Sequence, residues 1–145
     1  YVPYVGVAQT GQTITVKNSD PIFHNVHPTP KNTAGGNKEA NVAQVRKGQT
    51  NNFTYPAAER FLRFKCDIHG WMFSYLTVED HPWITVTAAD GSFTIKNVPP
   101  GEYEVEAIHR KVHGSTMAQG YKGDVQKVKV TADGGKANFT LNVPK

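Results

Sequence analysis

Three side chains with metal-binding chemistry stand close together near the middle of the chain. The segment Cys66-Asp67-Ile68-His69-Gly70-Trp71-Met72 presents a thiol, an imidazole and a thioether, with two residues between each and the next. Thiolate and thioether sulfurs favour soft metal ions such as copper. A single tight loop can bring these three groups to one ion, so the segment predicts a metal site that needs one more imidazole from elsewhere in the chain.

His24, in Asp20-Pro21-Ile22-Phe23-His24-Asn25-Val26-His27, is the natural source of that imidazole, and His27 is its chief rival. Two imidazoles and one thiolate in a roughly trigonal plane, with a weak axial Met, are the ligands of a blue-copper site. We therefore predict one copper ion held by His24, Cys66, His69 and Met72. A lone Cys is more often a buried structural thiol, and only its companions favour copper here.

Apolar and polar residues alternate in several short segments separated by Asp-Gly, Pro-Pro-Gly and Gly-Gly turn signals. This pattern predicts half-buried strands of antiparallel sheets. The expected strands are 12–17, 60–65, 73–78, 92–96, 102–106, 125–130 and 137–141. We expect no long helix, only a possible helical turn within 37–45, and residues 28–43 are predicted to form a surface loop because large apolar side chains are rare there.

A break at Glu79-Asp80-His81-Pro82 separates two all-β halves, which we assign as domains 1–80 and 81–145. The second half has hairpin punctuation at Asp90-Gly91 and at Val98-Pro99-Pro100-Gly101, a pattern typical of a sandwich. A domain of about 65 residues buries little surface. We therefore expect the second half to pack firmly against the first.

The ligand residues give the first half a resemblance to the cupredoxins, the type 1 blue-copper proteins, over roughly residues 4–79. The Cys-x-x-His-x-x-Met loop is most similar to that of the amicyanin- and plastocyanin-like members, and Pro-Ile-Phe-His-Asn-Val-His resembles the stretch around their first histidine. The resemblance implies a Greek-key β-sandwich in which Asn25 braces the ligand loops by hydrogen bonds. Amicyanin has proline where this chain has Gly70, a departure that would leave the backbone after His69 freer.

The second half resembles the carboxypeptidase-regulatory-like, or transthyretin-like, β-sandwiches through the segment from Asp90 to Tyr103. The resemblance implies a second small antiparallel β-sandwich and carries no catalytic meaning. The predicted fold class is therefore all-β, with a Greek-key cupredoxin sandwich followed by this smaller one.

The ligand set predicts a one-electron carrier cycling between Cu(I) and Cu(II), and not an enzyme. A copper oxidase or nitrite reductase would need a second, His-rich site, and the six histidines include no His-x-His pair. Trp71 either packs under the loop or forms an apolar rim through which electrons enter. The expected partner is a redox protein, such as a c-type cytochrome or a membrane redox complex. The alternative is a structural or docking subunit of a larger exported or membrane-associated redox complex, with or without copper.

Charge and hydropathy bear on two further classes of function, nucleic-acid binding and membrane insertion. The net charge of +4 is spread over both halves with no basic arm, so nucleic-acid binding is not indicated. No apolar run approaches the roughly 18 residues of a membrane span, and we find no signal-peptide pattern. The start at Tyr1 instead of Met suggests a processed product, which fits a place in the periplasm or at an extracellular face.

Overall fold

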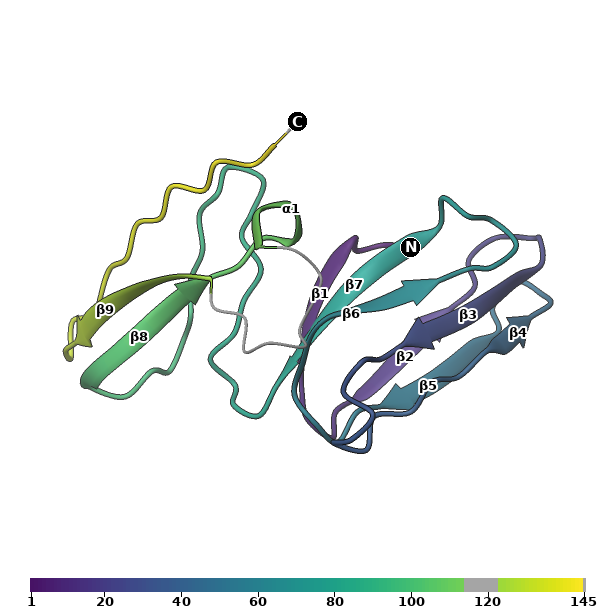
Figure 1. Cartoon of the computed structure of the whole chain (residues 1–145), viewed down its shortest axis with the longest axis horizontal. Helices are drawn as coiled ribbons and strands as arrows, with labels where there is room; N and C mark the ends of the chain where they lie inside the picture. Colours follow the sequence, from purple (N-terminus) through teal and green to yellow (C-terminus); the bar gives the residue numbers. More distant parts are fainter. Residues whose placement is uncertain (114–122, 145) are drawn as a thin grey trace. The chain divides into compact units, whose positions relative to one another are not determined.

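The computed structural model describes residues 1–113 and 123–144, and the chain divides into two compact units, Tyr1–Phe93 and Thr94–Lys145. Both units are built from strands, with one short helix among the described residues (Figure 1). The all-β prediction is therefore confirmed. The compact units divide at residue 93, whereas we predicted a domain boundary at residue 80.

The first unit contains two sheets. Its strands are β1 (Val5–Gln9), β2 (Thr13–Lys17), β3 (His24–Thr29), β4 (Val42–Gln44), β5 (Thr50–Thr54), β6 (Glu59–Lys65) and β7 (Phe73–Glu79). One sheet has the strand order β1-β7-β6-β3-β4, and β2 pairs with β5 in the other. Strands that neighbour one another in space are often distant in sequence, as in a Greek-key sandwich. β1 runs parallel to β7, and the other pairs in this unit are antiparallel.

The hydrophobic core of the first unit lies between these two sheets. Alternation places Ile14 of β2 directly opposite Phe53 of β5, and both side chains point inward. The buried cluster takes residues from both sheets: Ala8, Val26, Phe53, Tyr55, Leu62, Phe64, Leu76 and Val78. Two sheets that share one apolar layer form a β-sandwich, so the core holds in place the strands that carry the predicted ligands.

The segment 37–45 does not contain the helical turn that we considered. It forms β4, which pairs with the start of β3 so that Gln44 lies opposite His24. Ala40 and Val42 pack against the core cluster, and this contact with an existing sheet outweighs the weak local preference for a turn.

The second unit contains β8 (Gly101–Ala107), α1 (Arg110–His113) and β9 (Asp124–Val130). β8 and β9 form an antiparallel two-stranded sheet, in which Glu104 lies opposite Lys127 and Glu102 opposite Lys129. The predicted strands at 92–96 and 137–141 are wrong, because neither belongs to a regular ladder.

Candidate metal centre

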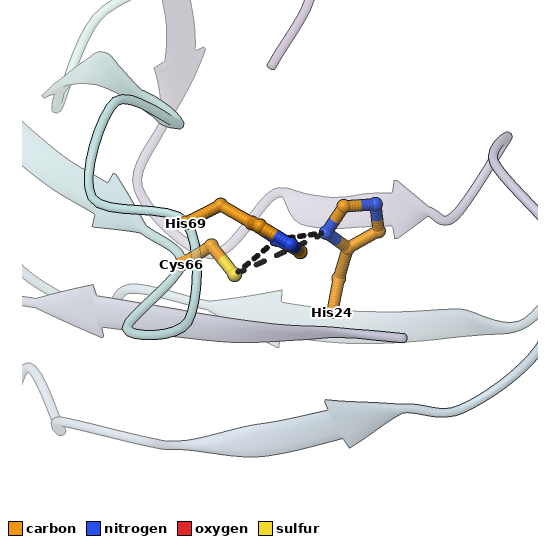
Figure 2. Close-up of side chains that lie close together, drawn as sticks. All are labelled: His24, Cys66 and His69. Atoms are coloured by element: carbon orange, nitrogen blue, oxygen red, sulfur yellow. Dashed lines mark hydrogen bonds between the residues drawn. The ribbon is translucent and has the colours of Figure 1, made fainter. Parts of the chain in front are cut away.

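Three metal-binding side chains meet at the start of β3 and the end of β6. Cys66 directly follows β6, His69 lies in the loop between β6 and β7, and His24 is the first residue of β3. One ligand atom from each lies within 4.8 Å of the other two. Figure 2 shows the two imidazole rings and the sulfur facing one another.

The strand register explains why these residues meet. In the antiparallel pair of β3 and β6, His27 lies opposite Lys65, so the beginning of β3 extends alongside the loop that follows β6. Lys65 also lies opposite Phe73 of β7. Residues 66–72 therefore form the loop that connects β6 to β7, and this loop lies beside the first residues of β3.

The loop itself is closed by backbone hydrogen bonds. The amide of Cys66 donates to the carbonyl of Met72 at 3.0 Å, and the amide of Met72 donates to the carbonyl of His69 at 2.8 Å. Nothing lies within 4 Å of the position that a Cβ at Gly70 would take. The backbone bonds therefore orient Cys66 and His69, and position 70 has room for a side chain.

The spacing of the donor atoms fits one metal ion. Nδ1 of His24 lies 3.1 Å from Nδ1 of His69, and the sulfur of Cys66 lies 3.7 Å from His69 Nδ1 and 4.0 Å from His24 Nδ1. With the nitrogen and sulfur bond lengths typical of zinc, trigonal or tetrahedral ligands stand about 3.4 Å (N to N) and about 3.7 Å (N to S) apart. The observed separations differ from these values by 0.3 Å or less, so only small shifts would be needed to bind an ion.

Cys66 lies in an environment that favours its thiolate form. Its side chain is buried, with 1% of the residue exposed, and this burial raises its pKa. The sulfur accepts hydrogen bonds from the backbone of Asn25, His69 and Ile68 and from the imidazole of His24. Together these bonds outweigh burial and lower the pKa of Cys66 to about 6. Because the thiolate is the metal-binding form, the site is prepared for a metal at neutral pH.

His24 is held by a carboxylate on the side of its ring away from the other ligands. Its Nε2 lies 3.0 Å from Oδ2 of Asp20, and only 5% of the residue is exposed. With the proton on Nε2, the tautomer that a metal ion would require, Nδ1 would offer its lone pair toward His69 and Cys66. Such a partner fixes both the tautomer and the ring orientation of a metal-binding histidine.

Met72 has a fixed backbone and a half-buried side chain. Its two backbone hydrogen bonds tie it to Cys66 and His69, the two ligands in its own loop. The role of its thioether as the axial ligand stays a prediction.

Asn25 lies between the thiol and the residue that follows it. Its Oδ1 is 3.3 Å from the sulfur of Cys66 and accepts the backbone amide of Asp67 at 2.8 Å. His27, the rival ligand, lies apart from the thiol: its two ring nitrogens contact Asp67 and Glu39, each at 2.6 Å. The structure therefore groups His24, and not His27, with Cys66 and His69.

Trp71 is exposed beside a ligand. Its ring centroid lies 5.4 Å from that of His69, and 77% of the residue is exposed. The exposed large apolar side chains next to the ligands in sequence are Ile22, Phe23 and Ile68. Trp71 is thus not buried under the loop, and the ligand end carries apolar side chains in contact with solvent.

Sequence reasoning missed several polar residues around the site. Asp20 and Asp67 contact a ligand or its neighbour, and the Tyr1 hydroxyl donates to the carbonyls of Asn25 and Lys65 at 3.3 and 3.1 Å. A carboxylate four residues before a predicted ligand, or directly after one, was the available signal for the two aspartates. No local pattern connects Tyr1 to residues 25 and 65.

A second group of metal-binding side chains lies at the end of β7. One ligand atom from each of Glu79, Asp80 and His81 lies within 4.8 Å of the others. Glu79 pairs with Arg60 at 3.2 Å, the other two residues are exposed, and His81 stacks on Trp83. This group lacks sulfur, and its Glu79 has a cation as partner, so it does not resemble the first.

Two comparisons with known proteins give matches, each to a different part of the chain. Residues 77–143 match the family described as BOS complex subunit NOMO1-like, second beta sandwich domain. A solved structure, the novel purple cupredoxin from Nitrosopumilus maritimus, is similar with 23% identity and a TM-score of 0.43, covering 52% of this chain and 78% of that one. No curated protein sequence matches the chain.

In the part of the chain that the structure describes, no helix is long and apolar enough to cross a membrane.

Proposed function

We propose that this chain is a one-electron carrier that holds one copper ion in a type 1 site. His24, Cys66 and His69 are the equatorial ligands in this proposal, and Met72 is the axial ligand. The observation that carries it is the convergence of one buried thiol and two imidazole nitrogens within 4.8 Å. Copper bound by such a set supplies a Cu(II)/Cu(I) couple.

The protein's part is to hold its ligands in one arrangement through both oxidation states. Asp20 orients the His24 ring, and the backbone bonds within residues 66–72 orient Cys66 and His69. The ligands then need to move little when an electron arrives or leaves. Burial of His24 and Cys66 keeps water from the sulfur, and hydrogen bonds to the sulfur tune the potential.

In this proposal the electron enters and leaves at His69, the least buried of the three ligands. Trp71 and its exposed apolar neighbours form a surface against which another redox protein can dock. Aromatic side chains are frequent anchors of such interfaces. A c-type cytochrome or a membrane redox complex is a partner of this kind.

The two resemblances seen in the sequence belong to the same proposal. We take residues 1–80 as an amicyanin- or plastocyanin-like cupredoxin domain and residues 81–145 as a carboxypeptidase-regulatory-like sandwich that attaches it to a larger assembly. A carrier of this design would work in the periplasm or at an extracellular face. The chain itself would catalyse no reaction.

A structural or docking role is the second candidate. The match of residues 77–143 to a domain of a complex subunit favours it. In this case the first unit would be a cap on a redox complex, with or without bound copper. A chain that binds no copper can only have the docking role, whereas a carrier must both bind copper and cycle one electron.

The test is the visible and electron paramagnetic resonance spectrum of the purified chain after one equivalent of Cu(II). We expect an intense thiolate-to-copper band with one copper per chain, and its loss in Cys66→Ser. His81→Gln is the control, because it removes an exposed imidazole outside the site, and it should keep the band. A colourless wild type without bound copper would refute the proposal and favour the docking role, and a site that takes only zinc would refute electron transfer.

A further inference from the structure

The carboxylate of Asp67, the residue after the Cys66 thiol, collects four donors. Its Oδ2 accepts from Asn25 Nδ2 at 3.0 Å, Asn41 Nδ2 at 2.9 Å and His27 Nδ1 at 2.6 Å. Its Oδ1 lies 2.8 Å from the ammonium of Lys65. These four donors fix the orientation of the carboxylate.

His27 joins this carboxylate to a second one. Its Nδ1 contacts Asp67, and its Nε2 contacts Oε1 of Glu39, both at 2.6 Å. Carboxylates accept hydrogen bonds, so the two contacts together favour a proton on each ring nitrogen, which is the imidazolium form. The pKa of His27 is raised mainly by the bond to Glu39; burial and Lys65 oppose this rise, and Asp67 adds to it.

The chain of contacts continues from this ring to the thiol. Asn25 and His27 alternate with Val26 along β3, so they share one face of the strand. Asn25 donates its amide protons to Asn41 at 2.6 Å and to Asp67 at 3.0 Å. Its Oδ1 therefore turns toward the Asp67 amide and accepts the S–H of the thiol form, and its backbone N–H donates to the thiolate form of Cys66.

We propose that His27 is a positioning residue for the metal centre, which holds Asp67 and through it Asn25, and so sets the hydrogen-bond environment of the Cys66 sulfur and the potential of the site. This role rests on the proposed function. The cluster contains two cations, His27 and Lys65, and two carboxylates, Glu39 and Asp67. Removing one charged member unbalances the charge beside the sulfur.

The direction in which each substitution shifts the reduction potential follows from the charges of this cluster. His27→Gln removes a positive charge, which favours Cu(II) over Cu(I) and lowers the potential. Glu39→Gln removes a negative charge and raises the potential when it is measured below pH 6.5, where His27 keeps its proton without the bond to Glu39. We expect the Cu(II)/Cu(I) affinity ratio to change about threefold or more in each variant, a shift of about 30 mV because tenfold corresponds to about 59 mV for one electron.

The first readout uses the metal-free protein. Nitrogen-15 NMR of the wild type at neutral pH should show protons on both ring nitrogens of His27. The side-chain amide signals of Asn25 should shift in His27→Gln. A neutral His27 ring in the wild type, or unchanged Asn25 signals in the variant, would overturn the proposal.

The second readout is the potential of the copper-loaded variants, with His81→Gln as the matched control outside the cluster. Opposite shifts in His27→Gln and Glu39→Gln, with no shift in the control, are the expected result. Glu39 is a safe second variant because its side chain is 61% exposed. If the wild type binds copper and neither potential moves, the role of His27 is overturned while the proposed function stands; if the wild type binds no copper, both fall.

Discussion

Glu59 is a charged side chain in the interior of the first unit, and replacing it with Gln should destabilise that unit strongly. The residue is 1% exposed. Its Oε1 accepts the backbone amide of Lys31 at 2.6 Å, and its Oε2 accepts the backbone amide of Asn32 at 3.2 Å and the side-chain amide of Asn37 at 2.9 Å. The carboxylate thereby anchors the loop between β3 and β4 to β6.

Glu59→Gln keeps the shape of the side chain but turns one acceptor oxygen into an NH₂ donor. Whichever way the amide is oriented, at least one of the three N–H groups then faces a donor. A hydrogen bond to a charged group contributes about 1.5–3 kcal/mol, and a buried group left unpaired costs about 1–3 kcal/mol. We therefore expect the free energy of unfolding to fall by about 2–4 kcal/mol, a large part of the roughly 5–15 kcal/mol that a domain has.

Urea unfolding followed by tryptophan fluorescence measures this change. Both tryptophans, Trp71 and Trp83, lie in the first unit, so the signal reports on that unit alone. With a slope of about 2 kcal/mol per molar urea, the midpoint should drop by about 1–2 M. The control is Glu79→Gln, where a pair with Arg60 near the surface contributes under about 1 kcal/mol. Equal midpoints for Glu59→Gln and the wild type would refute the reasoning that the buried carboxylate anchors the loop.

Three further predictions concern the ligand end. Trp71→Ala should leave the copper spectrum unchanged but slow electron self-exchange about tenfold, because the loss of about 1.4 kcal/mol of contact energy changes a rate tenfold. NMR line broadening measures this rate, and an unchanged rate would contradict the role of Trp71 in docking. Gly70→Ala should raise the free energy of unfolding in urea by about 0.4–1 kcal/mol, because the site has room for a methyl group and the unfolded chain loses freedom; destabilisation would show a conflict at that position. The pKa of His27 is raised from 6.5 in the folded protein, so its stabilising effect is complete below 6.5 and is lost as pH rises through the raised value. Thermal unfolding of the metal-free chain should show this decline, and His27→Gln should lack it; an identical decline in the variant would assign it to another group.

Alternation in the sequence was enough to find several of the strands. β2, β6, β8 and β9 lie within a residue or so of the predicted segments, because each has one face toward apolar residues and the other toward solvent. β1, β3, β4 and β5 were not among the predicted segments. β4 has only three residues, and β1 has no polar alternation, so each depends on pairing with a distant strand that local sequence does not reveal.

Part of the candidate site could likewise be predicted from local sequence, and part could not. The approach of Cys66 and His69 could be predicted, since a short loop carries both. His24 lies far away in sequence, and its place beside them depends on the register of β3 against β6. The contacts of His27 with Asp67 and Glu39 depend on that register and on the path of the loop before β4, so only the three-dimensional structure reveals them.

Reversible reduction of the copper-loaded chain is the most direct test of one-electron transfer at a copper ion bound by Cys66. The protein would be titrated with a one-electron reductant under anaerobic conditions and then reoxidised, with the thiolate-to-copper band followed throughout. The account predicts that one equivalent of electrons per copper bleaches the band completely and that reoxidation restores its full intensity over repeated cycles. A band that does not return, with Cys66 found oxidised by mass spectrometry, would contradict it.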